Sequence, residues 1–283
     1  MKPLLRKAKY RLVGLPIFPV LNAPFRAFNT WRIYIGPLVG RWLLWVVSSR
    51  EDSNFTYALT ERCKFTLAAS VASFLLRDFS EIDGYFREIE TDQEFIAHVG
   101  NLWRLHPERG RTDRTPHVGR RMVWYAVVRA LKPKVVIETG VDQGMGAAVL
   151  CAALLRNAAQ GCQGRYYGTD LNPSAGYFLK GRYSAIGSIL FGDSITSLAN
   201  FDGEIDLFIN DSDHSADYEA AEYQTVKSKL SSNAVILGDN AHVTTKLAEF
   251  SIQEGRRFMF FAEEPAQHWY SGAGIGISLA KPA

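Results

Sequence analysis

Apolar and polar positions follow different rhythms on either side of residue 134. Beyond it, short apolar runs alternate with segments in which apolar residues recur every three or four positions. This alternation is typical of a mostly parallel sheet that is covered by helices on both faces. We predict seven strands, at 135–139, 165–170, 189–193, 205–211, 234–239, 257–262 and 275–280. Helices are expected in the gaps between them, most clearly at 146–157, 216–230 and 244–253.

A turn-rich stretch without a helical pattern joins the last two predicted strands, which predicts an antiparallel last strand. The expected fold class is therefore α/β, a Rossmann-like, seven-stranded and mostly parallel sheet with an N-terminal helical accessory segment. Accessory helices are indicated upstream at 59–76, 91–105 and 116–130. We divide the chain into a basic and apolar N-terminal segment, a helical accessory region and a sheet domain, at 1–50, 51–114 and 115–283.

Composition narrows the compartment and the class of protein. With 283 residues, of which 47% are hydrophobic and 22% charged, the chain has ample material for a globular core. Its three cysteines form no Cys-x-x-Cys pair, which argues against structural zinc and a disulfide framework. A reducing compartment follows, so we expect a cytoplasmic protein, with the inner face of the membrane as a candidate location.

The N-terminal segment at 1–50 is strongly basic, because it contains nine Lys or Arg and no acidic residue. Its apolar run at 33–47 is shorter than the ~20 residues that a membrane-spanning helix needs. A signal peptide is disfavoured because the run starts late and lacks a convincing cleavage site. Three interpretations stay open: a packed accessory layer, a homo-oligomer interface, or a peripheral contact with an anionic membrane. Nucleic-acid binding is disfavoured because no recognisable binding motif accompanies the basic residues.

Acid and amide side chains end two consecutive predicted strands. Asp211 closes the run at 205–211, and Asp239 with Asn240 closes the next one. Consecutive parallel strands end at the same edge of a sheet, so these oxygens are expected to converge as ligands for Mg²⁺ or another divalent cation. His214 follows the first ligand by three residues and would face whatever the metal holds. Asp213 is the alternative to Asp211 as the first ligand.

A glycine turn follows the first predicted strand, in the run Glu138-Thr139-Gly140-Val141-Asp142-Gln143-Gly144. Glycines allow the backbone to approach a ligand closely, and the following helix start offers N–H donors. A nicotinamide site would require Gly-x-Gly-x-x-Gly, and the spacing here fits that pattern poorly. Glu138 would either contact a cofactor amino group through water or hold the turn.

The next two predicted strands also end on polar residues. Asp170 stands where a carboxylate can accept hydrogen bonds from both hydroxyls of a ribose, and Asp193-Ser194 stands where a polar group can meet an adenine amino group. Each acid alone is equally explained as the cap of the following helix. Their succession at three consecutive strand ends favours a nucleoside-type cofactor.

These motifs resemble the class I S-adenosylmethionine-dependent methyltransferases, and more narrowly the metal-dependent O-methyltransferases of the catechol, caffeoyl-CoA and macrolide-sugar type. The resemblance covers roughly residues 115–283. It implies a glycine turn around the methionine part of the cofactor, Asp170 on the ribose and Asp193 near the adenine. It also implies that the carboxylate and amide oxygens bind Mg²⁺, that Asp211 serves the cofactor and the metal, and that His214 is the general base. Histidine rather than lysine at this position is typical of the sugar-directed members.

The expected function is methyl transfer from S-adenosylmethionine to a sugar hydroxyl in a glycan, glycolipid or natural-product glycoside. The metal would orient one of two vicinal hydroxyls and lower its pKa, and His214 would remove the proton. A phenolic or catechol diol is the alternative acceptor. Rivals of another class are a nicotinamide-dependent oxidoreductase and a non-catalytic, membrane-associated binding module. Candidate contacts to the substrate are His242, His268, Trp269 and Tyr270.

Overall fold

The computed structural model describes residues 13, 15–51, 56–107, 109 and 117–281. The chain forms two compact units. The N-terminal unit consists of the residues up to Ser49 together with Gln267–Trp269, and the sheet unit contains Arg50–Ala266 and Tyr270–Ala283. Each unit is described by itself below.

A seven-stranded sheet forms the centre of the sheet unit, in the order β3-β2-β1-β4-β5-β7-β6. Its strands are β1 (Val135–Thr139), β2 (Arg165–Asp170), β3 (Gly187–Phe191), β4 (Ile205–Asn210), β5 (Leu230–Gly238), β6 (Arg257–Ala262) and β7 (Gly274–Leu279). The pairs among β1 to β5 are parallel, whereas β7 runs antiparallel to both β5 and β6. The predicted α/β fold with an antiparallel last strand is therefore confirmed.

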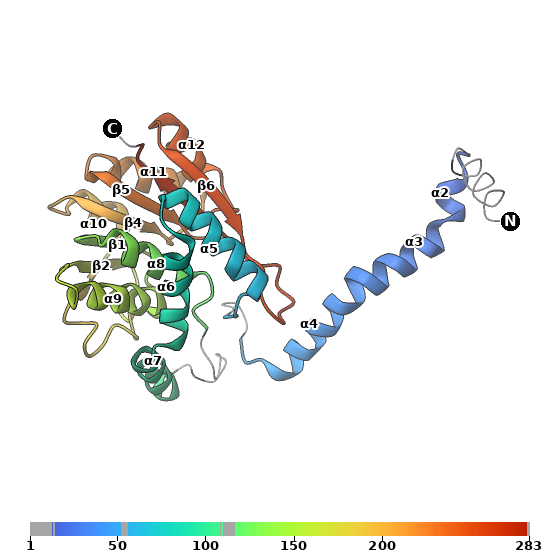
Figure 1. The fold of residues 1–283 in the computed structure, drawn as a ribbon, viewed down its shortest axis with the longest axis horizontal. Coiled ribbons are helices and arrows are strands. Elements are labelled where there is room, and N and C mark those ends of the chain that lie inside the picture. The colour runs from blue at the N-terminus through green and yellow to red at the C-terminus, as the bar shows by residue number, and fades with distance from the viewer. Residues whose placement is uncertain (1–12, 14, 52–55, 108, 110–116, 282–283) are drawn as a thin grey trace. The chain divides into compact units, whose positions relative to one another are not determined.

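Helices cover both faces of this sheet (Figure 1). One core packs α5 (Glu61–Leu75), α6 (Phe79–Thr91), α7 (Gln93–Leu105), α8 (Arg121–Leu131) and α9 (Met145–Ala158). The other packs α10 (Ser194–Ala199), α11 (Ala216–Lys227) and α12 (Lys246–Gln253). Successive strand residues point to opposite faces, so Leu207 and Ile209 enter the first core while Phe208 enters the second. This two-sided burial explains why the strands have nearly continuous apolar runs.

Two features differ from the sequence prediction. The prediction missed α6, because Gly84 and many charged residues mask its apolar positions, although Ile82, Phe86 and Ile89 are fully buried. No helix joins β2 to β3, where the described residues 171–186 form turns. Gly176 and Gly181 adopt positive φ in that stretch and interrupt any helical path. In addition, α8 begins at Arg121, and the predicted start at Pro116 lies outside the described residues.

The strand register brings the polar strand ends to one edge of the sheet. Thr139 of β1 pairs with Thr169 of β2 on one side and with Asn210 of β4 on the other. The ladder continues just past the strands, because the N–H of Asp211 donates to the carbonyl of Thr139 at 3.0 Å. The N–H of Asp239 likewise donates to the carbonyl of Asn210 at 2.8 Å. The residues that follow β1, β4 and β5 are thereby held side by side.

Gly140 is the residue on which this close approach depends. Its φ is +79°, a conformation that residues with a side chain rarely adopt. A Cβ added there would lie 2.0 Å from the carbonyl oxygen of Asp211. The turn after β1 and the loop after β4 can therefore come together only because this position has no side chain.

The N-terminal unit is almost entirely helical. Its elements are α2 (Phe18–Leu21), α3 (Ala23–Thr30), the π-helix η1 (Trp31–Ile35) and α4 (Gly36–Ser48). None of their residues is buried. Near its end, the ring of Trp45 packs edge-on against His268 and Trp269, with centroid distances of 6.3 and 5.4 Å. Among the helices described, none has both the length and the apolar character required to span a bilayer.

We predict that Gly140→Ala lowers the free energy of unfolding by about 2–5 kcal/mol, through left-handed backbone strain and a clash with Asp211. The matched control is Gly84→Ala, because Gly84 is an exposed helical residue whose added Cβ would contact nothing within 4 Å. That variant should gain about 0.5–1 kcal/mol. Urea unfolding of both variants measures the difference, and equal stability of the two would contradict the close-approach argument.

Candidate active site

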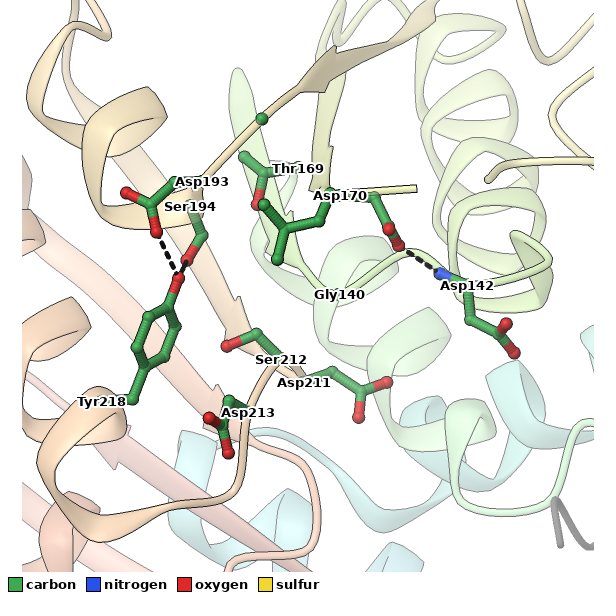
Figure 2. A pocket seen from close by; sticks show the side chains of 12 residues that line it. Gly140, Asp142, Thr169, Asp170, Asp193, Ser194, Asp211, Ser212, Asp213 and Tyr218 are labelled. Carbon is green, nitrogen blue, oxygen red and sulfur yellow. Dashed lines mark hydrogen bonds between the residues drawn. The ribbon is translucent and has the colours of Figure 1, made fainter. Parts of the chain in front are cut away.

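A cavity of about 390 Å³ lies at the carboxyl ends of β1, β2 and β4 and beside the loop that follows β3 (Figure 2). Its walls come from the glycine turn, from the polar ends of three strands and from α11. The lining residues are Gly140, Asp142, Thr169, Asp170, Leu171, Gly192, Asp193, Ser194, Asp211, Ser212, Asp213 and Tyr218. The structure therefore brings five of the predicted cofactor residues together around one space: Gly140, Asp170, Asp193, Ser194 and Asp211.

Asp170 is oriented by backbone donors on both of its oxygens. One oxygen accepts a hydrogen bond from the N–H of Asp142 at 2.8 Å (Figure 2). The other oxygen accepts a hydrogen bond from the N–H of Asn172 at 2.8 Å. The first bond ties the end of β2 to the glycine turn after β1. A carboxylate held in this way keeps free lone pairs for two adjacent hydroxyl donors.

Asp193 caps a helix and lines the cavity at the same time. One of its oxygens accepts a hydrogen bond from the N–H of Thr196, at the start of α10, at 2.8 Å. The other accepts from the hydroxyl of Tyr218 at 2.7 Å (Figure 2). These bonds, that of Tyr218 first, lower the pKa of Asp193, so it is ionised at neutral pH. The capping explanation and the binding explanation therefore do not exclude each other.

The polar lining of the cavity fits a nucleoside-type cofactor. The Oγ1 of Thr169 lines the cavity and is buried, yet it has no hydrogen-bond partner among the described residues. A buried hydroxyl normally finds a partner, so this atom indicates a polar ligand. Together with Asp170 and Asp193, it gives the cavity the donors and acceptors that a ribose and an adenine need.

Three further predicted cofactor residues support the turn and do not line the cavity. Gly144 precedes α9 in the left-handed conformation, with φ +88°. Thr139 is buried and its hydroxyl donates to Glu222 at 3.3 Å. Glu138 is buried, accepts a hydrogen bond from the hydroxyl of Tyr166, and lies where a side chain on Gly146 would clash with it. Of the two roles considered for Glu138, the geometry favours that of holding the turn.

Glu222 is a site residue that the sequence analysis missed. It is fully buried behind the cavity and accepts hydrogen bonds from Ser194, Asn210 and, at 2.8 Å, Ser212. Burial raises the pKa of Glu222 to about 7, although the hydrogen bonds from Ser194 and Ser212 lower it in part. The signal was its spacing of four residues from Tyr218 and from Val226, which places the acid on the inward face of α11.

A second group of polar residues adjoins the cavity. Ligand atoms of Asp211, His214 and Asp239 lie within 4.8 Å of one another. The imidazole Nε2 of His214 is 3.9 Å from an oxygen of Asp211 and 3.0 Å from the side-chain amide of Asn240. All four predicted residues therefore meet. Asp213, the alternative ligand, is exposed and accepts a hydrogen bond from the N–H of Ser215 at 2.9 Å.

Arg120 lies against this group, and the sequence analysis did not identify it. Its guanidinium forms a two-pronged ion pair with both oxygens of Asp239, whose side chain is fully buried. It also lies 3.7 Å from Glu263, which accepts a hydrogen bond from the hydroxyl of Tyr57 at 2.8 Å. The available signal was a pair of arginines, Arg120 and Arg121, where the mostly apolar helix α8 begins.

Charge in this group is unevenly compensated. Burial disfavours ionisation of Asp239, but Arg120 outweighs it and lowers the pKa of that carboxyl to about 2. Burial and the neighbouring Asp239 carboxylate raise the pKa of Asp211 well above its usual range. Two adjacent carboxylates, of which Asp239 is buried and Asp211 partly buried, need a cation or a proton between them. The oxygen and imidazole donors of Asp211, Asp239 and His214 thus fit a divalent cation, which would share Asp239 with Arg120.

The candidate substrate residues belong to two different units. Tyr270 lies in the sheet unit, where the centroid of its ring is 5.8 Å from that of Tyr57. His242 is exposed, and partial desolvation and then the charge of Arg120 lower its pKa. His268 and Trp269 belong to the N-terminal unit. Only Tyr270 and His242 therefore lie in the unit that holds the cavity.

Comparison with known proteins agrees with this architecture. Residues 137–241 match the model of a family described as a methyltransferase domain. These residues run from β1 to just past β5 and contain the cavity and the carboxylates. The strand order and this match agree with the predicted class, a class I, S-adenosylmethionine-dependent methyltransferase domain. A search of curated proteins found no significant match.

Solved structures of methyltransferases resemble the chain at low identity. The O-methyltransferase TomG from Streptomyces achromogenes, in complex with S-adenosylmethionine, is 11% identical, with a TM-score of 0.49 over 79% of this chain and 100% of its own. The methyltransferase PaMTH1 from Podospora anserina is 16% identical, with a TM-score of 0.48 over 67% and 88%. An O-methyltransferase from Bacillus cereus is 13% identical, with a TM-score of 0.45 over 76% and 97%. These likenesses are too distant to assign a substrate.

We predict that Glu138 makes stability fall as pH rises. Burial raises the pKa of Glu138 to about 8, so between its unfolded pKa, near 4.3, and pH 8 the folded protein binds more protons than the unfolded chain. Its destabilising contribution is absent below the unfolded pKa and grows up to pH 8. Glu138→Gln should therefore lose less stability than the wild type between pH 5 and pH 8.

Chemical denaturation at several pH values measures this difference. Glu204→Gln, at an exposed position, is the matched control and should follow the wild-type curve. A steeper pH dependence in Glu138→Gln than in the wild type would show that Glu138 is ionised in the folded protein.

Proposed function

We propose that this protein is an Mg²⁺-dependent O-methyltransferase that transfers the methyl group of S-adenosylmethionine to a sugar hydroxyl in a glycan, glycolipid or natural-product glycoside. One observation supports the proposal most strongly: Asp211 lines the cofactor cavity and also belongs to the cluster with Asp239 and His214. A methyl donor in the cavity and an acceptor at the cluster would therefore be neighbours, as an in-line displacement requires.

The cofactor would be held by residues with distinct tasks. Asp170 would accept hydrogen bonds from the ribose hydroxyls, and Asp193 would meet the adenine amino group. Gly140 would let the backbone approach the methionine part, and the hydroxyl of Thr169 would gain the partner that it lacks among the described residues. Glu222 would keep Ser194 and Ser212 in place behind the cofactor.

The acceptor would be oriented and deprotonated at the adjoining cluster. Asp211, Asp239 and Asn240 would hold the divalent cation, which when bound supplies positive charge that lowers the pKa of a neighbouring hydroxyl. His214 is partly exposed and 3.9 Å from Asp211, so its imidazole can reach a hydroxyl at this point and take its proton. Arg120 holds Asp239 in position and limits the negative charge of the cluster.

A sugar is favoured over a phenolic diol by the base. Phenols are already acidic, whereas a sugar hydroxyl needs both a nearby positive charge and a base to become a nucleophile. His214 at this position is also the residue of the sugar-directed enzymes that the sequence resembles. A catechol acceptor would use the same cluster of Asp211 and Asp239, so the choice of acceptor is open to direct test.

We expect S-adenosylhomocysteine, but not NAD, to raise the melting temperature of the protein, and Asp193→Ala to weaken its binding by about tenfold through loss of the adenine contact. Transfer of labelled methyl groups from S-adenosylmethionine to a panel of glycosides and catechols then tests the acceptor. Labelling of catechols alone would replace the sugar assignment. Stabilisation by NAD alone would overturn the proposal as a whole.

We expect Mg²⁺ or Mn²⁺ to bind to the wild type and EDTA to abolish methyl transfer. Asp211→Asn should weaken metal binding at least tenfold, since even indirect metal contacts are worth about 10–100-fold. Asp213→Asn is the matched control, because this exposed neighbour lies outside the cluster, and it should bind metal normally. Isothermal titration calorimetry measures both variants, and the opposite ranking would move the ligand to Asp213.

The base is tested separately. His214→Ala should keep its affinity for S-adenosylhomocysteine and lose about 10²–10⁴-fold in turnover. Near-normal turnover of this variant would leave Asp211 and Asp239 as the only functional part of the cluster.

A further inference from the structure

The described part of the N-terminal unit presents exposed apolar side chains from Val13 to Val47. Large apolar residues that are more than 40% exposed recur at Leu21, Phe28, Ile35 and Trp42, and others lie between them. This seven-residue stripe of the sequence has one residue in each of α2, α3, η1 and α4. This surface is far larger than the scattered apolar residues that a water-exposed helix tolerates.

The remaining sides of α4 are apolar as well. Leu43, Leu44, Val46 and Val47 are half or more exposed, and Val47 reaches 80%. A partner helix packed along the seven-residue stripe would leave these side chains in water. A lipid interface is not limited to one stripe, because it takes up apolar side chains over a broad face of a helix.

Charge in this unit has one sign. Arg26, Arg32 and Arg41 are its cations in α3, η1 and α4, and residues 1–50 contain no acid at all. A second copy of the helix would therefore bring like charges together without any acidic residue to pair with them. The anionic headgroups of a lipid bilayer supply the missing counter-charge.

We propose that residues 18–48 bind peripherally to an anionic lipid surface and lie in the plane of its interface. The apolar side chains would enter the acyl region, and the three arginines would extend to the phosphates. Trp31, Trp42 and Trp45 are of the type that prefers this interface. Peripheral attachment agrees with the finding that none of the described helices is fit to span a bilayer.

This inference does not depend on the methyltransferase assignment, because it concerns only the N-terminal unit. Its test uses neither metal nor S-adenosylmethionine. A failure here would leave the cavity and the carboxylate cluster untouched, and a failure there would leave this surface unchanged.

The experiment is co-sedimentation of the full chain with vesicles of phosphatidylcholine and phosphatidylglycerol in a 3:1 ratio, compared with pure phosphatidylcholine. The wild type should partition onto the anionic vesicles about tenfold or more better, with a blue shift of tryptophan fluorescence. Arg26→Glu/Arg32→Glu/Arg41→Glu should abolish this preference. Phe28→Ser/Trp42→Ser/Leu44→Ser should weaken binding to both kinds of vesicle.

The matched control is Ile252→Ser/Phe260→Ser, which removes two exposed apolar side chains from the sheet unit. This control should bind both kinds of vesicle like the wild type. Equal sedimentation of the wild type with and without anionic vesicles would overturn the proposal. So would a stable oligomer, measured by light scattering, that dissociates in the Phe28→Ser/Trp42→Ser/Leu44→Ser variant and never binds vesicles. That second result would assign the surface to another copy of the chain.

Discussion

Two neighbouring carboxylates, the buried Asp239 and the partly buried Asp211, form the constraint around which the sheet unit is arranged. The parallel pairing of β4 and β5 brings them together, and Arg120 neutralises only one of them. Such a pair is costly unless a cation or a proton completes it. The fold thus creates a place that attracts positive charge, directly beside a cavity with a polar lining.

The structure supports this place with residues that do not face the cavity. Glu222 and Glu138 are both buried, and each is satisfied by hydroxyl or amide donors from neighbouring elements. Buried acids in satisfied networks lock the side chains around them into one arrangement. Gly140 completes the arrangement by letting two loops meet at backbone distance. Precise placement here therefore depends on what lies behind the site as much as on what lines it.

The two units use apolar residues in opposite ways. In the sheet unit, alternate strand residues enter two separate cores, and almost every large apolar side chain of the inner strands is buried. In the N-terminal unit, the helices α2 to α4 bury none. Apolar residues therefore form the core of one unit and an exposed surface in the other. In the sequence, this difference in the use of apolar residues is indicated only by the N-terminal segment, which lacks the alternation of strand-like and helix-like apolar patterns.

The sequence by itself determined the succession of strands and helices along the chain, the antiparallel last strand, and the polar residues at the strand ends. These features depend on local periodicity and on the rules of parallel sheets. Only the tertiary structure decided that Asp211 and not Asp213 lies near Asp239, that Arg120 pairs with Asp239, and that His268 and Trp269 belong to the N-terminal unit. Those outcomes depend on loop paths and on contacts between residues more than a hundred positions apart. No local pattern encodes them, and the missed helix α6 shows the same limit, since packing and not propensity stabilises it.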